Sequence, residues 1–230
     1  MNRDEFYDAL YLAHHGVKGQ KWGVRRYQNY DGTRIKSGEY ARSMHQKASK
    51  IEPKITKDVT DAIKQSGASV YGLDHRLKTE ESLSRKIQKY SSDKKIGLKE
   101  AAGSIKDAVR YTSVADDGNF VPSYNKTKRS LQDKGYSETE CENYFDLYRQ
   151  GKAKHKQINC IYEDADGNKF ELQFHTPSSI KAKEIKTPLY EEARSKGVSP
   201  ERKAVLVKQM EDLAKTVKDP KDVYSIKSHG

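Results

Sequence analysis

Two runs with strand-like alternation, 157–163 and 168–176, flank the pair Asp166-Gly167. Asp-Gly is a preferred sequence for a tight turn between antiparallel strands, so the two runs predict a β-hairpin. Side chains alternate between the two faces of a strand. In the second run one face is apolar and is expected to join a core, whereas the other carries a row of polar side chains. That polar row is Glu171, Gln173 and His175.

Helices and further strands are expected on both sides of this hairpin. Apolar residues spaced four apart predict a helix over 39–66, interrupted at Pro53 by a break or a second helix start and ended by Gly67. Gly135 is expected to end another helix as a left-handed residue. Segment 142–148 fits either a strand or a helix. The other expected helices are 79–90, 119–134, 177–196 and 200–217, and the other expected strands are 69–72 and 108–114.

The composition points to anionic partners without selecting one. The 230 residues carry a formal net charge of +11, and 33% of them are charged against 34% hydrophobic. Such an excess of cations favours a nucleotide, RNA, DNA or an acidic surface. A soluble protein with a lysine-rich surface explains the same charge equally well.

The sequence indicates a protein of a reducing cytosol. Its two cysteines, Cys141 and Cys160, form neither a disulfide framework nor a CxxC zinc motif. No apolar stretch approaches the roughly 20 residues that span a membrane. The first residues lack the apolar region of a signal peptide. We therefore expect a soluble protein with no membrane partner.

The run 76–87 has the composition of a phosphate-binding loop and helix. Arg76 and Lys78 precede a helix start at Thr79, and Ser82 and Lys86 are four residues apart on one helix face. A helix N-terminus adds unpaired N–H groups and a partial positive charge. Cations, a hydroxyl and a helix end at one place suit a polyphosphate, although a solvated lysine-rich helix has the same appearance.

The polar row of the hairpin supplies a candidate metal ligand, Glu171. Magnesium bound to phosphates is usually held by one or two carboxylates, so a second carboxylate is needed. Asp107 is the preferred candidate, because it stands at the start of the strand 108–114 and Arg110 follows within that strand. Asp116 and Asp117 are less favoured, since they lie beside a glycine in an expected turn.

These elements resemble the synthetase domain of the RelA/SpoT family over roughly residues 70–195. Residues 76–87 match the pattern R-x-K-[ST]-x-x-S-[IL]-x-R-K-[IM] at every defined position, and 171–176 resemble E-[IL]-Q-[IL]-R-T. The resemblance implies an α+β fold, with a mixed β-sheet flanked by helices and with helical extensions at both ends. It also divides the chain into an N-terminal arm (1–40), a helical segment (41–68), the synthetase-like domain (69–197) and a C-terminal helix and tail (198–230).

The resemblance implies an ATP-dependent pyrophosphokinase that uses Mg²⁺. ATP would be the donor, and its β,γ-pyrophosphate would pass to a ribose hydroxyl. Asp107 and Glu171 would bind the metal and act in catalysis with Gln173, which would orient the acceptor side. The residues implied to hold the ATP phosphates are Arg76, Lys78, Ser82 and Lys86, with Arg110 directed into the same cleft.

The chain departs from the family pattern mainly on the acceptor side. The family's base-stacking tyrosine falls on His155, and the arginine of its Q-x-R-T segment becomes His175. The Asp-to-Arg spacing ahead of the strand is also shortened, to Asp107-x-x-Arg110. We therefore expect His155 and His175 to bind the acceptor, which would be a nucleotide or, as in toxin-like relatives, tRNA.

Residues 14–33 resemble a segment of bacteriophage and prophage head-associated proteins. This resemblance implies a phage or prophage origin and a head-protein partner, and it places the protein in the bacterial cytoplasm or on the phage particle. A disordered basic tail is the alternative for this segment. Three functions remain open for the whole chain: a pyrophosphokinase acting as a growth-arresting toxin, a catalytically degenerate phage head protein, and a basic nucleic-acid-binding module.

Overall fold

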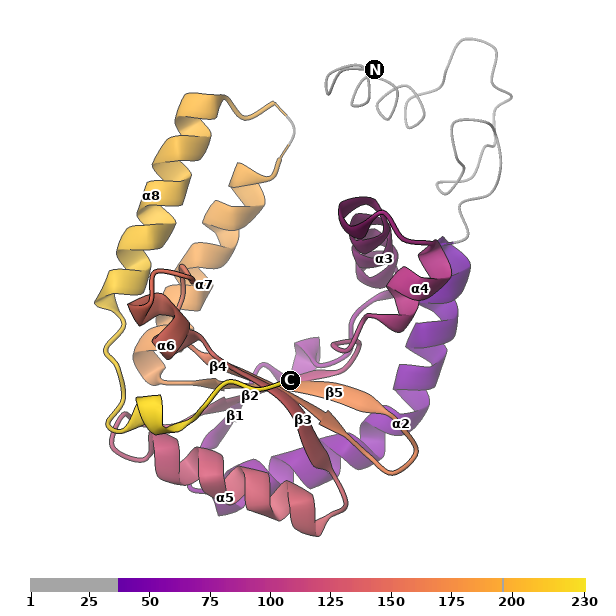
Figure 1. Ribbon diagram of the computed structural model, residues 1–230, viewed down its shortest axis with the longest axis vertical. Coiled ribbons are helices and arrows are strands. Elements are labelled where there is room, and N and C mark those ends of the chain that lie inside the picture. The colour runs from indigo at the N-terminus through magenta and orange to yellow at the C-terminus, as the bar shows by residue number, and fades with distance from the viewer. Residues whose placement is uncertain (1–36, 196) are drawn as a thin grey trace. The chain divides into compact units, whose positions relative to one another are not determined.

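A computed structural model describes residues 37–195 and 197–230 of the chain (Figure 1). The described residues divide into two compact units. The helical unit contains residues 37–47 and 79–105, and the sheet unit contains residues 48–78 and 106–230. Residues 1–36 of the expected basic arm (1–40) lie outside the described residues.

The sheet unit is built on a five-stranded mixed sheet with the order β1-β2-β5-β4-β3. β2 and β5 are parallel, and the other neighbouring pairs are antiparallel. β4 and β5 form the hairpin expected around Asp166-Gly167, and Gly167 has a positive φ of 77°. The strands are β1 (Ser69–Tyr71), β2 (Arg110–Val114), β3 (Ser137–Asn143), β4 (Ile158–Glu163) and β5 (Lys169–His175).

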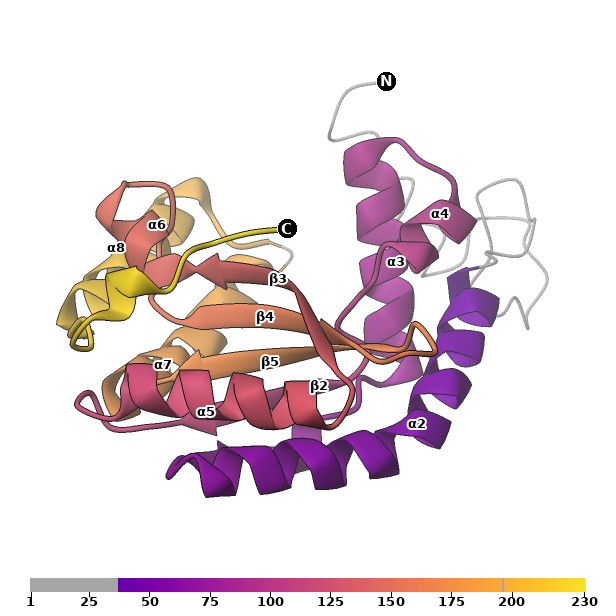
Figure 2. The same cartoon turned by 60° about the horizontal axis from the view of Figure 1, so that its bottom comes forward.

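Helices cover the sheet and extend beyond it. α2 (Ser37–Gln65) begins in the helical unit and continues into the sheet unit, where its second half and α5 (Phe120–Asp133) lie along one face of the sheet (Figure 2). α7 (Pro177–Ala193) contacts β5 and pairs with α8 (Pro200–Thr216). Short elements are η1 (Leu73–His75), α6 (Tyr144–Arg149) and η2 (Val223–Ser225).

The core of the sheet unit lies between the sheet and the helices α2 and α5. Phe170 is at its centre, because its ring contacts those of Tyr111, Tyr136 and Tyr162 at centroid distances of 5.8, 5.4 and 5.5 Å. Aromatic burial of this kind contributes both apolar area and favourable ring geometry. With this face of β5 in the core, alternation directs the polar row of β5 to the opposite face.

The helical unit contains the start of α2 together with α3 (Glu80–Lys94) and α4 (Leu98–Gly103). Thr79 caps α3, because its hydroxyl accepts a hydrogen bond from the Ser82 backbone N–H at 3.2 Å. Leu83 and Ile87 are fully buried. These two apolar side chains hold α3 in place and leave its polar side chains on the other faces of the helix.

The α+β fold with a mixed sheet is confirmed, and most expected elements are found within a few residues. The expected break at Pro53 is wrong: α2 continues past it, and Ile55 and Val59 in the next turns are buried, so their burial offsets the lost backbone bond. Segment 142–148 changes from strand to helix at Asn143, whose side chain accepts hydrogen bonds from the N–H groups of Phe145 and Asp146. In the described ranges no helix is long and apolar enough to cross a membrane.

Candidate functional site

Asp107, Arg110 and Glu171 form a charged cluster on the polar face of the sheet. β2 and β5 are parallel and in register, so Arg110 stands directly beside Glu171. The Arg110 guanidinium donates from Nε to the Glu171 carboxylate and from Nη2 to Asp107 Oδ2, the latter at 2.6 Å. One planar cation therefore bridges two carboxylates, and we call these three residues the carboxylate cluster.

The carboxylates of this cluster are buried, so each needs a nearby opposite charge. The Asp107 and Glu171 side chains are 8% and 9% exposed, and that of Arg110 is 32% exposed. Burial opposes the charge of Arg110, but Glu171 and Asp107 hold its pKa above the usual value. Breaking a buried pair is costly, because the remaining charge is left uncompensated. The two carboxylates thus depend on a cation between them.

Lys78 and Arg76 run beside the entry of β2. The Lys78 N–H donates to the Ala108 carbonyl at 3.0 Å, and the Arg110 N–H donates to the Arg76 carbonyl at 2.7 Å. Lys78 Nζ lies 3.4 Å from Asp107 Oδ2, which adds a second cation to the cluster. The Arg76 guanidinium instead pairs with Glu52 on α2.

Ser82 and Lys86 belong to the helical unit, one turn apart on α3. Ser82 Oγ accepts a hydrogen bond from Arg85 at 3.3 Å, and Lys86 Nζ lies 5.6 Å from the centre of the Tyr90 ring. The predicted phosphate-binding set is therefore divided between the two units. A shared site for these two residues and the carboxylate cluster stays a prediction.

Gln173 and Lys183 extend the polar row of β5 toward α7. Gln173 Nε2 donates to Glu171 Oε1 at 3.1 Å, and its own oxygen accepts from Lys183 Nζ at 2.7 Å. The Gln173 amide is therefore oriented at both ends. Lys183 was missed by the sequence reasoning, because one lysine among 44 basic residues carries no distinguishing signal.

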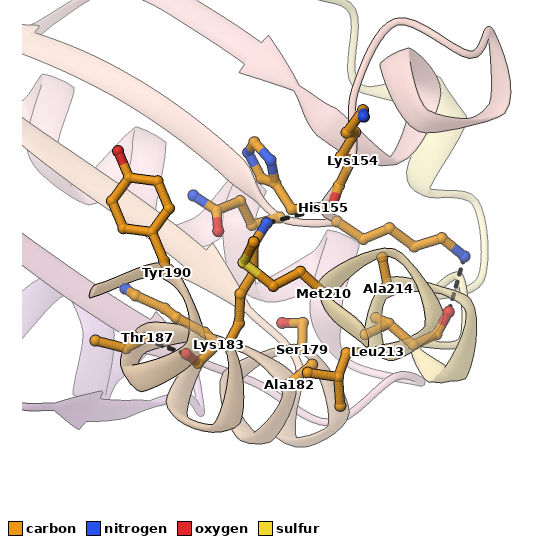
Figure 3. Close-up of a pocket in the computed structure, with 14 residues that line it drawn as sticks. Lys154, His155, Ser179, Ala182, Lys183, Thr187, Tyr190, Met210, Leu213 and Ala214 are labelled. Carbon is orange, nitrogen blue, oxygen red and sulfur yellow. Dashed lines mark hydrogen bonds between the residues drawn. The ribbon is translucent and has the colours of Figure 1, made fainter. Parts of the chain in front are cut away.

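A pocket of about 260 Å³ lies between α7, α8 and the loop that precedes β4 (Figure 3). Its lining combines lysines with apolar side chains of α8 such as Met210 and Leu213. Lys183 belongs to this lining and also bonds to Gln173, so the pocket adjoins the polar row that contains Glu171. The other basic residues of the lining are Lys154, His155, Lys156 and Lys186.

The two histidines predicted to bind the acceptor occupy different positions. His155 lines the pocket, and its ring lies 4.2 Å from that of Tyr144, centre to centre. Burial and the nearby Lys186 lower the pKa of His155 to about 4, so its imidazole is neutral at physiological pH. His175 is 1% exposed, and its Nδ1 lies 2.9 Å from the hydroxyl of Ser179, which lines the pocket. Direct acceptor binding by His175 stays a prediction.

The half-buried amine of Lys183 predicts a rise of the free energy of unfolding with pH. Burial, and then the charge of Arg110, lower the pKa of Lys183 to about 8 from its usual 10.5. Between these values the unfolded chain binds more protons than the folded one, so the free energy of unfolding should increase from about pH 8 upward. Below pH 8 both states carry the proton and the contribution is constant. Urea denaturation followed by circular dichroism measures this slope.

Lys183→Met should remove the contribution, whereas Lys181→Met, at an exposed position of the same helix, should leave it. The comparison between the two variants cancels the titration of every other group. Equal slopes for both variants above pH 8 would contradict the placement of the Lys183 amine.

Comparison with solved structures identifies the fold. Small alarmone synthetase 2 from Bacillus subtilis matches with a TM-score of 0.50 and 14% identity, over 78% of this chain and 91% of that one. Small alarmone synthetase 1 from the same organism, bound to its product pppGpp, gives a TM-score of 0.49 and 17% identity over 75% and 88%. The Type VI effector Tas1 with its immunity protein gives 0.47 and 18% over 77% and 96%. The match to small alarmone synthetase 2 shows that the chain has the fold of a small alarmone synthetase.

Comparison by sequence reaches only the N-terminal segment. Residues 8–29, which lie outside the described residues, match a family of unknown function (DUF7211). No curated protein matches the chain. The function of the sheet unit must therefore be argued from its own residues.

Proposed function

We propose that the chain is a pyrophosphokinase that transfers the β,γ-pyrophosphate of ATP to a ribose hydroxyl. The observation that carries the proposal is the carboxylate cluster, in which Arg110 bridges Asp107 and Glu171 with Lys78 beside it. Transfer of a phosphoryl or pyrophosphoryl group depends mainly on positioning and on neutralising the charge of phosphate oxygens. Buried carboxylates and cations on one sheet face supply both requirements.

Asp107 and Glu171 are suited to hold Mg²⁺. The donors are oxygen atoms, which this ion prefers, and both side chains are more than nine-tenths buried and contact the same guanidinium, that of Arg110. When bound, the ion would neutralise charge on the phosphate oxygens of ATP. Arg110 and Lys78 pair with these carboxylates. With the ion on the carboxylates, these two cations would be available to contact the phosphates of ATP.

The chain's own residues would then position the two reactants. Lys78, Arg110 and Arg76 would contact the ATP phosphates together with Ser82 and Lys86. The acceptor hydroxyl oxygen would form a bond to the β-phosphorus while the bond from that phosphorus to the bridging oxygen of AMP breaks. The Glu171 carboxylate is our candidate to receive the hydroxyl proton.

The pocket beside α7 and α8 is our candidate acceptor site. Its basic lining suits the phosphates of a nucleotide or of a tRNA end, and the neutral ring of His155 offers a surface for stacking on a base. Gln173 links this pocket to Glu171 and would orient the acceptor hydroxyl. His175 would act through Ser179 or after a side-chain movement, since it is buried.

The N-terminal segment is the basis of our proposal for the partner and the cellular role of this chain. Residues 14–33 would bind a phage head protein, and the enzyme would act as a growth-arresting toxin in the bacterial cytoplasm or accompany the phage particle. This segment overlaps the 8–29 match to a family of unknown function. A degenerate head protein would keep the fold but would not transfer pyrophosphate, so the same assay separates the two functions.

Purified protein should be incubated with γ-labelled ATP, Mg²⁺ and, in separate reactions, GDP, GTP, ATP and tRNA. We expect label to appear on at least one acceptor, with AMP released in equal amount. Folded protein that transfers label to none of the four would contradict the enzymatic function. The acceptor that is labelled identifies the occupant of the pocket.

A further inference from the structure

Two cysteines and a histidine meet across three neighbouring chain segments on β3, β4 and the C-terminal stretch. Cys141 pairs directly with Cys160 in the β3–β4 ladder, and on its other side it pairs with His229. The Cys141 N–H donates to the His229 carbonyl at 2.8 Å, and the His229 N–H donates to the Cys141 carbonyl at 2.9 Å. Side chains directly opposite one another in a sheet project from the same face. The two Sγ atoms lie 3.3 Å apart.

Glu138 joins this group because of an irregularity in β3. Residues three apart on a regular strand face opposite sides, but the register shifts between Glu138 and Glu140. The extra residue brings the Glu138 carboxylate to the side of Cys141. One carboxylate oxygen of Glu138 and both Sγ atoms lie within 4.8 Å of one another.

The Glu138 carboxylate is held in place by three donors. Tyr162 Oη donates at 2.7 Å, Tyr124 Oη at 2.9 Å and Lys128 Nζ at 2.7 Å. The side chain is only 1% exposed. In metal sites, a ligating carboxylate is usually oriented by hydrogen-bond donors of this type.

His229 is arranged to present its second ring nitrogen. Its Nδ1 lies 3.3 Å from the Lys227 carbonyl, a distance at which an Nδ1–H donates and leaves the lone pair on Nε2. Nε2 lies 3.6 Å from Glu138 Oε1, and the side chain is 44% exposed. A ring nitrogen fixed by a backbone carbonyl on its other side is the usual arrangement of a metal-bound histidine.

We propose that Cys141, Cys160, Glu138 and His229 form a structural zinc site. Thiolate sulfur, imidazole nitrogen and carboxylate oxygen are all ligand atoms of tetrahedral Zn²⁺, and thiolates are foreign to Mg²⁺. The Glu138 oxygen and the two Sγ atoms already lie within 4.8 Å of one another, and the half-exposed His229 side chain would turn toward them to complete the set. On binding, each thiol loses its proton to solvent as its sulfur–zinc bond forms. The two thiolates and the carboxylate are then balanced by the ion and Lys128.

Zinc at this position would fasten the C-terminal segment to the edge of the sheet. That segment is also held by Asn143, whose side-chain amide donates to the carbonyls of Val223 and Ile226 at 2.8 and 2.9 Å. Nearer the pocket, Lys156 pairs with Asp219 at 2.8 Å. The metal would therefore stabilise the segment that supports one side of the pocket.

The test is zinc content. Full-length protein, reduced and loaded with zinc sulfate, is desalted and measured by inductively coupled plasma mass spectrometry. We expect one zinc per chain in the wild type and background in Cys141→Ser and Cys160→Ser. Glu140→Gln, a neighbouring carboxylate of β3 outside the set, should keep one zinc. Wild-type protein that keeps both thiols reduced and holds no zinc would overturn the proposal.

A second variant avoids the core. His229→Ala changes a half-exposed residue, so it should fold like the wild type, and we expect its zinc affinity to fall at least about tenfold. Cobalt chloride provides an independent readout, because a thiolate bound to Co²⁺ gives a strong charge-transfer absorption that the free protein lacks. Wild-type zinc affinity in His229→Ala, or no such absorption in the wild type, would overturn the four-ligand site.

Discussion

Glu171→Gln is expected to lower pyrophosphate transfer by at least about a hundredfold, a typical loss when one electrostatic contact to the transition state is removed. Glutamine has the same shape, so the strand and its contact with Gln173 should persist, but the charge shared with Asp107 disappears. The substitution therefore removes both the proposed metal ligand and the proposed proton acceptor. Initial rates of label transfer from ATP measure the effect, and circular dichroism confirms the fold.

A matched control is Glu163→Gln, at the end of β4 in the same sheet, where the carboxylate lies 3.2 Å from Lys169. It should keep the wild-type rate within about twofold, since surface ion pairs contribute little. If Glu171→Gln were fully active in a protein that transfers label, the catalytic assignment would be wrong even though the activity was right. If neither the wild-type protein nor Glu163→Gln transferred label, the proposed function itself would be wrong.

The local elements of the fold were predictable because they depend on short-range patterns. The Asp166-Gly167 turn and the alternation on both sides of it defined the β4–β5 hairpin, which the structure confirms. The expected break at Pro53 follows from the local effect of proline, which removes a helix hydrogen bond. The burial of the following turns depends on segments far away in the sequence, so a local pattern does not predict it.

The candidate site was predictable in its residues but not in its pairing. Alternation placed Arg110 on its strand and Glu171 on another, yet nothing local indicated that β2 and β5 are parallel neighbours in register. For the same reason the sequence does not predict the contact of Lys183 with Gln173, which comes from a helix that begins after the strand. The sequence also does not predict the group around Cys141, because strand pairing and a shifted register bring its members together.

Removing the cation between the two buried carboxylates should destabilise the protein. Arg110→Met keeps much of the side-chain volume, but it leaves Asp107 and Glu171 without the guanidinium that bridges them. We expect a loss of about 3 kcal/mol in the free energy of unfolding, the low end of the range for breaking a buried ion pair. Urea denaturation in the presence of EDTA measures this loss.

Magnesium should restore part of that stability, and this result separates a metal site from a simple ion pair. A ligand that binds only the folded state stabilises it by mass action. Without Arg110 to compete, Asp107 and Glu171 should bind Mg²⁺ more readily, so MgCl₂ should raise the denaturation midpoint of Arg110→Met more than that of the wild type. Arg149→Met, which removes an exposed partner of Asp146, controls for general salt effects. An equal rise in Arg110→Met and Arg149→Met would mean that the two carboxylates do not share a divalent ion.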